Sequence, residues 1–227
     1  MSAFQRIFLT ALIAGVVAGL FAAGVQRIRI IPLIESAEVY EAGEVHGGDT
    51  GAGLAEAWQP RAGLERAAFT ALADVLAGIG FAFLLTGAIA LASLRGYVIN
   101  AQLGILWGAA GFTVFALAPA LGLPPLPPGM EAAGLVQRQV WWIATATTTA
   151  LGLGLIAFPK RLIYPVIGVS LLILPHLIGA PAPPEIGGKV PSGIVAEFVA
   201  ASLAAAGLFW LLLGIIAGWL YHRLARA

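Results

Sequence analysis

Cysteine is absent from the 227 residues of this chain. Its absence excludes disulfides, thiolate metal sites and thiol catalysis, so any bound metal must be held by oxygen and nitrogen ligands. Charged residues are also scarce, at 10% of the sequence, whereas a soluble domain carries about 25%. The formal net charge is only +1 and no basic run is present, which excludes a nucleic-acid partner.

Catalytic signatures are missing as well. The sequence contains no glycine-rich phosphate loop followed by lysine and no nucleophile-elbow pattern around a serine. Direct ATP hydrolysis and acyl transfer are therefore not supported, and we predict that the protein is not an enzyme.

Hydrophobic residues make up 60% of the sequence and gather in six long runs. About 20 consecutive apolar residues match the hydrocarbon thickness of a bilayer, where a helix satisfies its own backbone hydrogen bonds. The pattern predicts an all-α fold, a polytopic membrane helical bundle that forms one integral membrane domain over residues 1–227. The six predicted transmembrane helices lie at about 5–31, 65–94, 98–118, 137–158, 162–179 and 194–222.

Two of these runs have special features. The first begins behind Arg6 and has no convincing small-residue cleavage site, so we expect it to be retained as a signal anchor. The fifth is the weakest, because Pro165 and Pro175 interrupt it.

Glycines recur four residues apart in three of the runs, as Gly15–Gly19, Gly104–Gly108 and Gly214–Gly218. Small residues at this spacing allow two helix backbones to approach closely. We therefore expect these glycines to lie at helix–helix contacts in a compact bundle.

The connections between the runs predict an orientation. Lysine and arginine are dense in the N-terminus, 95–97, 159–161 and the C-terminus, and sparse in the longer connections. Because basic residues favour the cytoplasmic side, we predict that both termini are cytoplasmic. The acidic loop 32–64 and the proline-rich loops 119–136 and 180–193 would then lie outside, the proline-rich loops covering the outer mouth.

The acidic loop contains Glu35, Glu38 and Glu41, which repeat every third residue, followed by His46. If the first helix continued into this segment, Glu35 and Glu38 would lie on neighbouring faces. Carboxylates and an imidazole are ligands that a divalent metal such as Co²⁺, Ni²⁺ or Zn²⁺ accepts. The alternative is an ordinary solvated acidic surface.

Three ionisable residues fall within or at the ends of apolar runs, at similar expected depth: Asp74, His176 and Glu197. A charge inside a membrane is costly and usually marks an ion path, so the three are candidate metal ligands. Each has a structural alternative. Glu197 could stabilise a helix N-terminus capped by Ser192, and His176 could bond a carbonyl freed by Pro175.

Several stretches in succession are similar to one family. They include FQRIFLTALIAGVVAGL at the start, EVYE at Glu38 to Glu41, LERAAFTALADVLAGIGFA, GFTVFALAPALGLPPLPPGM, RQVWW, LPHLIGAP and the closing FWLLLGIIAGWL. On these residues the chain resembles the CbtA family, the proposed cobalt-transporter subunits of bacterial inner membranes.

The resemblance implies cobalt uptake linked to cobalamin supply, usually alongside CbtB, a small single-span partner with a histidine-rich end. This chain departs from the family's pattern in two respects. The family's acidic first loop often has several histidines where this chain has only His46, and the family is usually drawn with about five spans rather than six. The alternatives are a channel or secondary transporter for another cation or small solute, and a membrane scaffold that does not transport.

Overall fold

The computed structural model describes residues 1–41, 61, 63–158, 161–183 and 187–226. Every named element in these residues is a helix, and the only β-type pairing among them is an isolated bridge. The helices are α1 (Ala3–Val25), η1 (Gln26–Ile30), α2 (Ile31–Glu41), α3 (Leu64–Leu94), α4 (Ala101–Phe112), η3 (Thr113–Leu117), α5 (Ala118–Ala120), α6 (Leu135–Ala157), α7 (Ile163–Ile178) and α8 (Ser192–Ala225). The predicted all-α class is therefore confirmed.

All six predicted helical runs are present, and the first extends further than expected. α1 continues through η1, a π-helical turn, into α2, so that one helix covers Ala3–Tyr40. Residues 32–41, predicted to begin a loop, are therefore helical. The helix begins at a capping box, in which the Ser2 side chain accepts from the Gln5 amide and the Gln5 side chain accepts from Ser2.

Five helices in the described part of the chain are long and apolar enough to cross a membrane. The sixth, α7, has only 16 residues and so measures about 24 Å, less than the ~30 Å hydrocarbon core. Prolines do not interrupt it, because Pro165 lies in its first turn and Pro175 is accommodated within its last turn. It ends before Gly179, whose positive φ of 89° suits a helix terminus.

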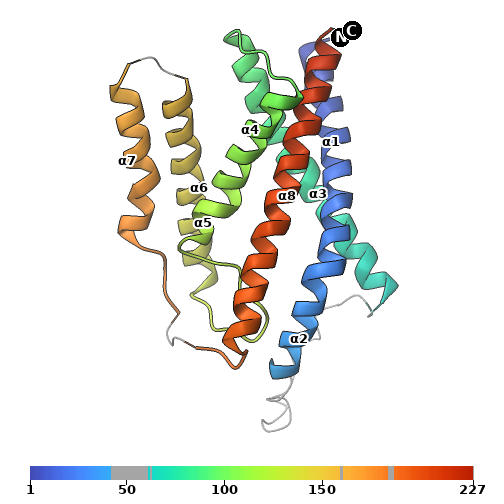
Figure 1. Cartoon of the computed structure of the whole chain (residues 1–227), viewed down its shortest axis with the longest axis vertical. Helices are drawn as coiled ribbons and strands as arrows, with labels where there is room; N and C mark the ends of the chain where they lie inside the picture. Colours follow the sequence, from blue (N-terminus) through green and yellow to red (C-terminus); the bar gives the residue numbers. More distant parts are fainter. Residues whose placement is uncertain (42–60, 62, 159–160, 184–186, 227) are drawn as a thin grey trace.

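The chain runs up and down the bundle, and both termini lie at the same end (Figure 1). α7 runs antiparallel to α6 and packs alongside it, although it is shorter than the five candidate membrane spans. At the opposite end the two proline-rich loops pair with each other (Figure 1). Met130 and Gly188 form the isolated bridge, and the Glu131 N–H donates to the Gly187 carbonyl at 3.4 Å.

The glycine pairs lie at close helix contacts, as the four-residue spacing predicted. A Cβ on Gly19 would lie 2.7 Å from the Asp74 carbonyl oxygen, so α1 touches the backbone of α3 there. Gly104 and Gly108 of α4 meet Gly214 and Gly218 of α8 in the same way. The bundle is thus assembled from backbone contacts that only glycine permits.

An aromatic cluster fills the space between α3, η3 and α8. Phe115 stacks on Trp210 with centroids 5.3 Å apart, and Phe81 lies 5.1 Å from Trp210 and 6.3 Å from Phe209. Trp210 is almost fully buried. These rings fill the centre of the bundle between the three helices.

Candidate cation site

Asp74 lies on α3, ten residues after the helix begins at Leu64, and therefore about 15 Å along its axis. The Gln26 side chain donates a hydrogen bond from Nε2 to Asp74 Oδ1 at 2.8 Å. The second carboxylate oxygen, Oδ2, is buried and has no hydrogen-bond partner among the described residues. An oxygen in this position has unused capacity to bind a cation or a proton.

A cavity of about 350 Å³ lies beside this carboxylate, between the first helix, α3 and α8. It is lined by Ala22, Gln26, Ile30, Asp74, Ala77, Gly78, Phe81, Ser202, Ala205, Ala206 and Phe209. Only three of these side chains are polar: Gln26, Asp74 and Ser202. Because a water molecule takes about 30 Å³ in the liquid, the cavity can hold a cation with several waters.

The sequence positions the polar pair through helical spacing. Gly19 and Gln26 are seven residues apart and share one face of the first helix, while Asp74 and Gly78 are four apart and share one face of α3. The glycines bring the two backbones together, and this approach places Gln26 within reach of Asp74. Gln26 also opens the π-helical turn, a feature frequent at functional sites.

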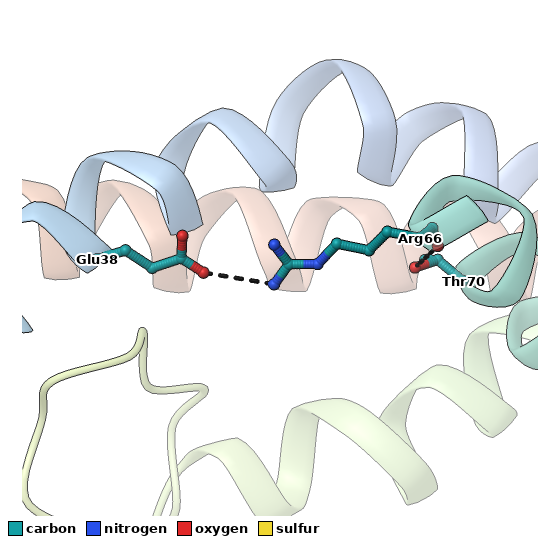
Figure 2. Close-up of polar contacts among 3 residues, drawn as sticks. All are labelled: Glu38, Arg66 and Thr70. Carbon is teal, nitrogen blue, oxygen red and sulfur yellow. Dashed lines mark hydrogen bonds and ion pairs between the residues drawn. The ribbon is translucent and has the colours of Figure 1, made fainter. Parts of the chain in front are cut away.

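The acidic segment lies on α2, toward the end of the bundle opposite the termini, which is called the loop end below. Glu38 pairs with Arg66 of α3 at 3.5 Å, and both side chains are substantially exposed (Figure 2). The Arg66 carbonyl in turn accepts a hydrogen bond from the Thr70 hydroxyl at 3.0 Å (Figure 2). Glu35 is exposed on the same helix. Glu41 is the last residue of α2, and His46 lies outside the described residues.

His176 lies in a different part of the molecule, in the last turn of α7. Its ring is partly buried and meets Trp141 of α6 edge-on, with centroids 5.9 Å apart. No bond to a carbonyl freed by Pro175 is formed among the described residues, and the imidazole makes this edge-on contact with Trp141 instead.

Glu197 is exposed near the start of α8. The expected cap is wrong: α8 begins at Ser192 itself after Pro191, and no side chain caps it. Glu197 lies five residues before Ser202, which is about 8 Å along the helix from the cavity wall.

The structure does not bring Asp74, His176 and Glu197 into one cluster. Within the described ranges, no three His, Asp or Glu side chains lie close enough to hold a metal ion together. Of the three residues, Asp74 lines the cavity, and its role as a metal ligand stays a prediction. The sequence prediction missed Gln26, whose signal was the seven-residue spacing from Gly19, and Ser202, which has no distinguishing signal among the alanines of α8.

A bundle of apolar helices with a carboxylate lining a cavity between them defines a class, the polytopic helical membrane proteins, in which such a residue usually marks an ion or proton path. Within that class the chain belongs to the CbtA family, described as "Probable cobalt transporter subunit (CbtA)", which matches residues 4–222. The match confirms the resemblance found in the sequence. No curated protein and no solved structure matches the chain.

Proposed function

We propose that this protein is the membrane-spanning subunit of a divalent-cation uptake system, with Co²⁺ as its substrate and cobalamin supply as its purpose. The observation that carries the proposal is the unpartnered Asp74 oxygen beside a cavity within the span of a cobalt transporter family member. A partly buried carboxylate with one unpartnered oxygen is unfavourable in its ionised form, and a bound cation offsets that cost.

The acidic residues at the loop end gather the cation in this proposal. Glu35, Glu38 and Glu41 of α2, together with His46, raise the local concentration of divalent ions by electrostatic attraction. Arg66 competes for one of these carboxylates, because it already pairs with Glu38. The outer segment therefore attracts cations without holding them tightly.

The cation then moves from this end of the bundle to Asp74. In this proposal Glu197, which is exposed on α8 before Ser202, adds to the attraction at that end, and Asp74 carries the inner site. Since His176 packs on Trp141 in the α6–α7 pair, a packing role is favoured for it over ligation.

The proposed location is a bacterial inner membrane with both termini cytoplasmic. Two observations support it: the termini lie at one end, and the acidic segment and the proline-rich loops lie toward the other. A small single-span CbtB-like subunit is the proposed partner, whose histidines would supply the nitrogen ligands that this chain has in small number.

Uptake of radiolabelled Co²⁺ by cells carrying the protein, with and without the neighbouring subunit, tests the proposal. We expect Asp74→Asn to reduce uptake roughly 10-fold to 100-fold, since it removes the charge from the inner site. Glu65→Gln is the matched control, because Glu65 lies on the same helix but outside the cavity. Uptake by Asp74→Asn equal to that of the control would contradict the proposal, and absence of flux in liposomes with the partner would favour a scaffold instead.

A further inference from the structure

We propose that Gln26, Asp74 and Ser202 form a single oxygen-ligand site for a partly hydrated divalent cation, and that this site discriminates only weakly between Co²⁺ and Mg²⁺ or Mn²⁺. The inference rests on the proposed function and specifies which cations its inner site accepts. Its basis is the composition and geometry of the cavity wall.

The three polar side chains come from three different helices: Gln26 opens η1, Asp74 lies on α3 and Ser202 on α8. All other lining residues are alanine, glycine, isoleucine or phenylalanine. The available ligand atoms are thus carboxylate, amide and hydroxyl oxygens, with no imidazole or sulfur on the described wall. Such oxygen ligands suit Mg²⁺ and Mn²⁺, whereas imidazole favours the later transition metals.

The charge of the site also limits how tightly it holds a cation. Among the described lining residues Asp74 alone is ionisable, so a divalent ion bound there would keep one positive charge that these residues do not neutralise. Such an ion retains several waters, as Mg²⁺ does when one carboxylate binds it, and the cavity volume allows this. A weakly held, partly hydrated ion can leave again, as transport requires.

Gln26 has a specific part in this site. Its Nε2 donates to Asp74 Oδ1, which fixes the carboxylate, and its Oε1 is carried on the same planar amide. A cation on Asp74 repels the amide hydrogens and attracts the amide oxygen, so rotation about the last side-chain bond turns Gln26 from a donor into a ligand. A residue with only a packing role has no such second state.

The far side of the site is closed by aromatic rings. Phe81 and Phe209 each lie seven residues beyond a polar member of the site, toward the end that holds the termini. Their centroids are 6.3 Å apart, and Phe81 continues into the contact with Trp210. A cation on Asp74 therefore meets a hydrophobic barrier in that direction, which identifies the site as a resting position before the barrier.

The test measures binding of ⁵⁷Co²⁺ to the purified full-length protein in lipid nanodiscs, with Mg²⁺ or Mn²⁺ as competitor. We expect either competitor to displace Co²⁺ from the Asp74-dependent site at concentrations within roughly 100-fold of the Co²⁺ concentration. Failure of both competitors, even in far larger excess, would overturn the inference.

Substitutions of Gln26 separate a ligand from a packing residue. Gln26→Leu should weaken Co²⁺ binding roughly 10-fold or more, while Gln26→Glu should tighten it because a second carboxylate faces the ion. If Gln26 only packs against Asp74, Gln26→Glu should weaken Co²⁺ binding, since the substitution replaces an amide donor by a carboxylate that repels Asp74. Gln102→Leu on the exposed face of α4 is the matched control, and Ser202→Ala should weaken binding less than Gln26→Leu.

The outcomes distinguish this inference from the proposed function. If the wild-type protein binds no Co²⁺, or if Asp74→Asn binds it as the wild type does, the proposed function fails. If Asp74→Asn abolishes binding but Gln26→Leu and Gln26→Glu both match the Gln102→Leu control, only the assignment of Gln26 fails. Circular dichroism of each variant verifies that the helices are intact, and Gln26→Glu supplies an independent reading if Gln26→Leu does not fold.

Discussion

Asp74 and His176 are both ionisable residues within apolar helices, yet the space and the contacts around their side chains differ. Asp74 lies where the first helix, α3 and α8 leave a cavity, and one of its oxygens has no partner among the described residues. His176 lies in the α6–α7 pair, where it is partly buried and meets the ring of Trp141 edge-on. The contrast shows that two ionisable residues in apolar helices differ in whether their neighbours leave space beside them, which is the condition that the proposed binding role of Asp74 requires.

Glycine contacts occur in both regions but have different consequences. Gly19 brings the first helix against the backbone of Asp74, next to the polar pair. Gly152 and Gly168 bring α6 against α7, where the contact serves helix packing alone. Changes at these two contacts therefore offer the sharpest comparison of the regions.

The largest effect is expected at Gly19. In Gly19→Ala the new Cβ would fall 2.6 Å from Val75 Cα and 2.7 Å from the backbone carbonyl oxygen of Asp74, so α1 and α3 must separate. We expect the free energy of unfolding to fall by about 1–3 kcal/mol and Co²⁺ binding to weaken at the same time, as measured by thermal unfolding and by binding in nanodiscs. Gly24→Ala is the control, because nothing lies within 4 Å of its added Cβ.

Gly152→Ala tests the other side of the comparison. Its Cβ would lie 2.7 Å from the Gly168 carbonyl oxygen, so a similar loss of about 1–3 kcal/mol is expected. Co²⁺ binding should nevertheless stay at the wild-type value, because the cavity is built by other helices. A matching loss of binding in Gly152→Ala would remove the distinction between the regions.

A smaller effect is expected for His176→Ala. Removing the edge-on contact with Trp141 should lower the free energy of unfolding by about 0.5–1.5 kcal/mol and leave Co²⁺ uptake within about twofold of wild type. Thermal unfolding and cellular uptake measure the two quantities. A loss of uptake comparable to that of Asp74→Asn would indicate that His176 is a metal ligand and not only a packing residue.

The smallest effect is expected at the exposed pair. Arg66→Gln removes the 3.5 Å contact with Glu38, and an exposed ion pair contributes only about 0–1 kcal/mol to stability. The freed carboxylate should increase Co²⁺ uptake slightly at low ionic strength, and the increase should vanish in high salt as screening removes the attraction. Arg61→Gln provides a comparison in which no Glu38 pair is broken; an equal rise there would assign the effect to net charge.

Much of the architecture follows from the sequence. Long apolar runs can satisfy their backbone hydrogen bonds in lipid only as helices, so six helices were predictable, and the glycine spacing indicated where they touch. Asp74 was recognisable because a carboxylate inside such a run is costly. The continuation of the first helix through Glu41 was expected only as a possibility, since charged residues favour a helix or a loop according to what packs beside them.

The sequence alone determined the class of the protein, its helices and the ionisable residues that fall within them, Asp74 among them, because these depend on local composition and helical period. Only the tertiary structure decided that Gln26 donates to Asp74, that Ser202 lines the same cavity as Asp74, and that Trp141 meets His176 edge-on. Each of those partners comes from a helix distant in sequence. Whether a polar atom is paired depends on that packing, which no periodicity within one helix records.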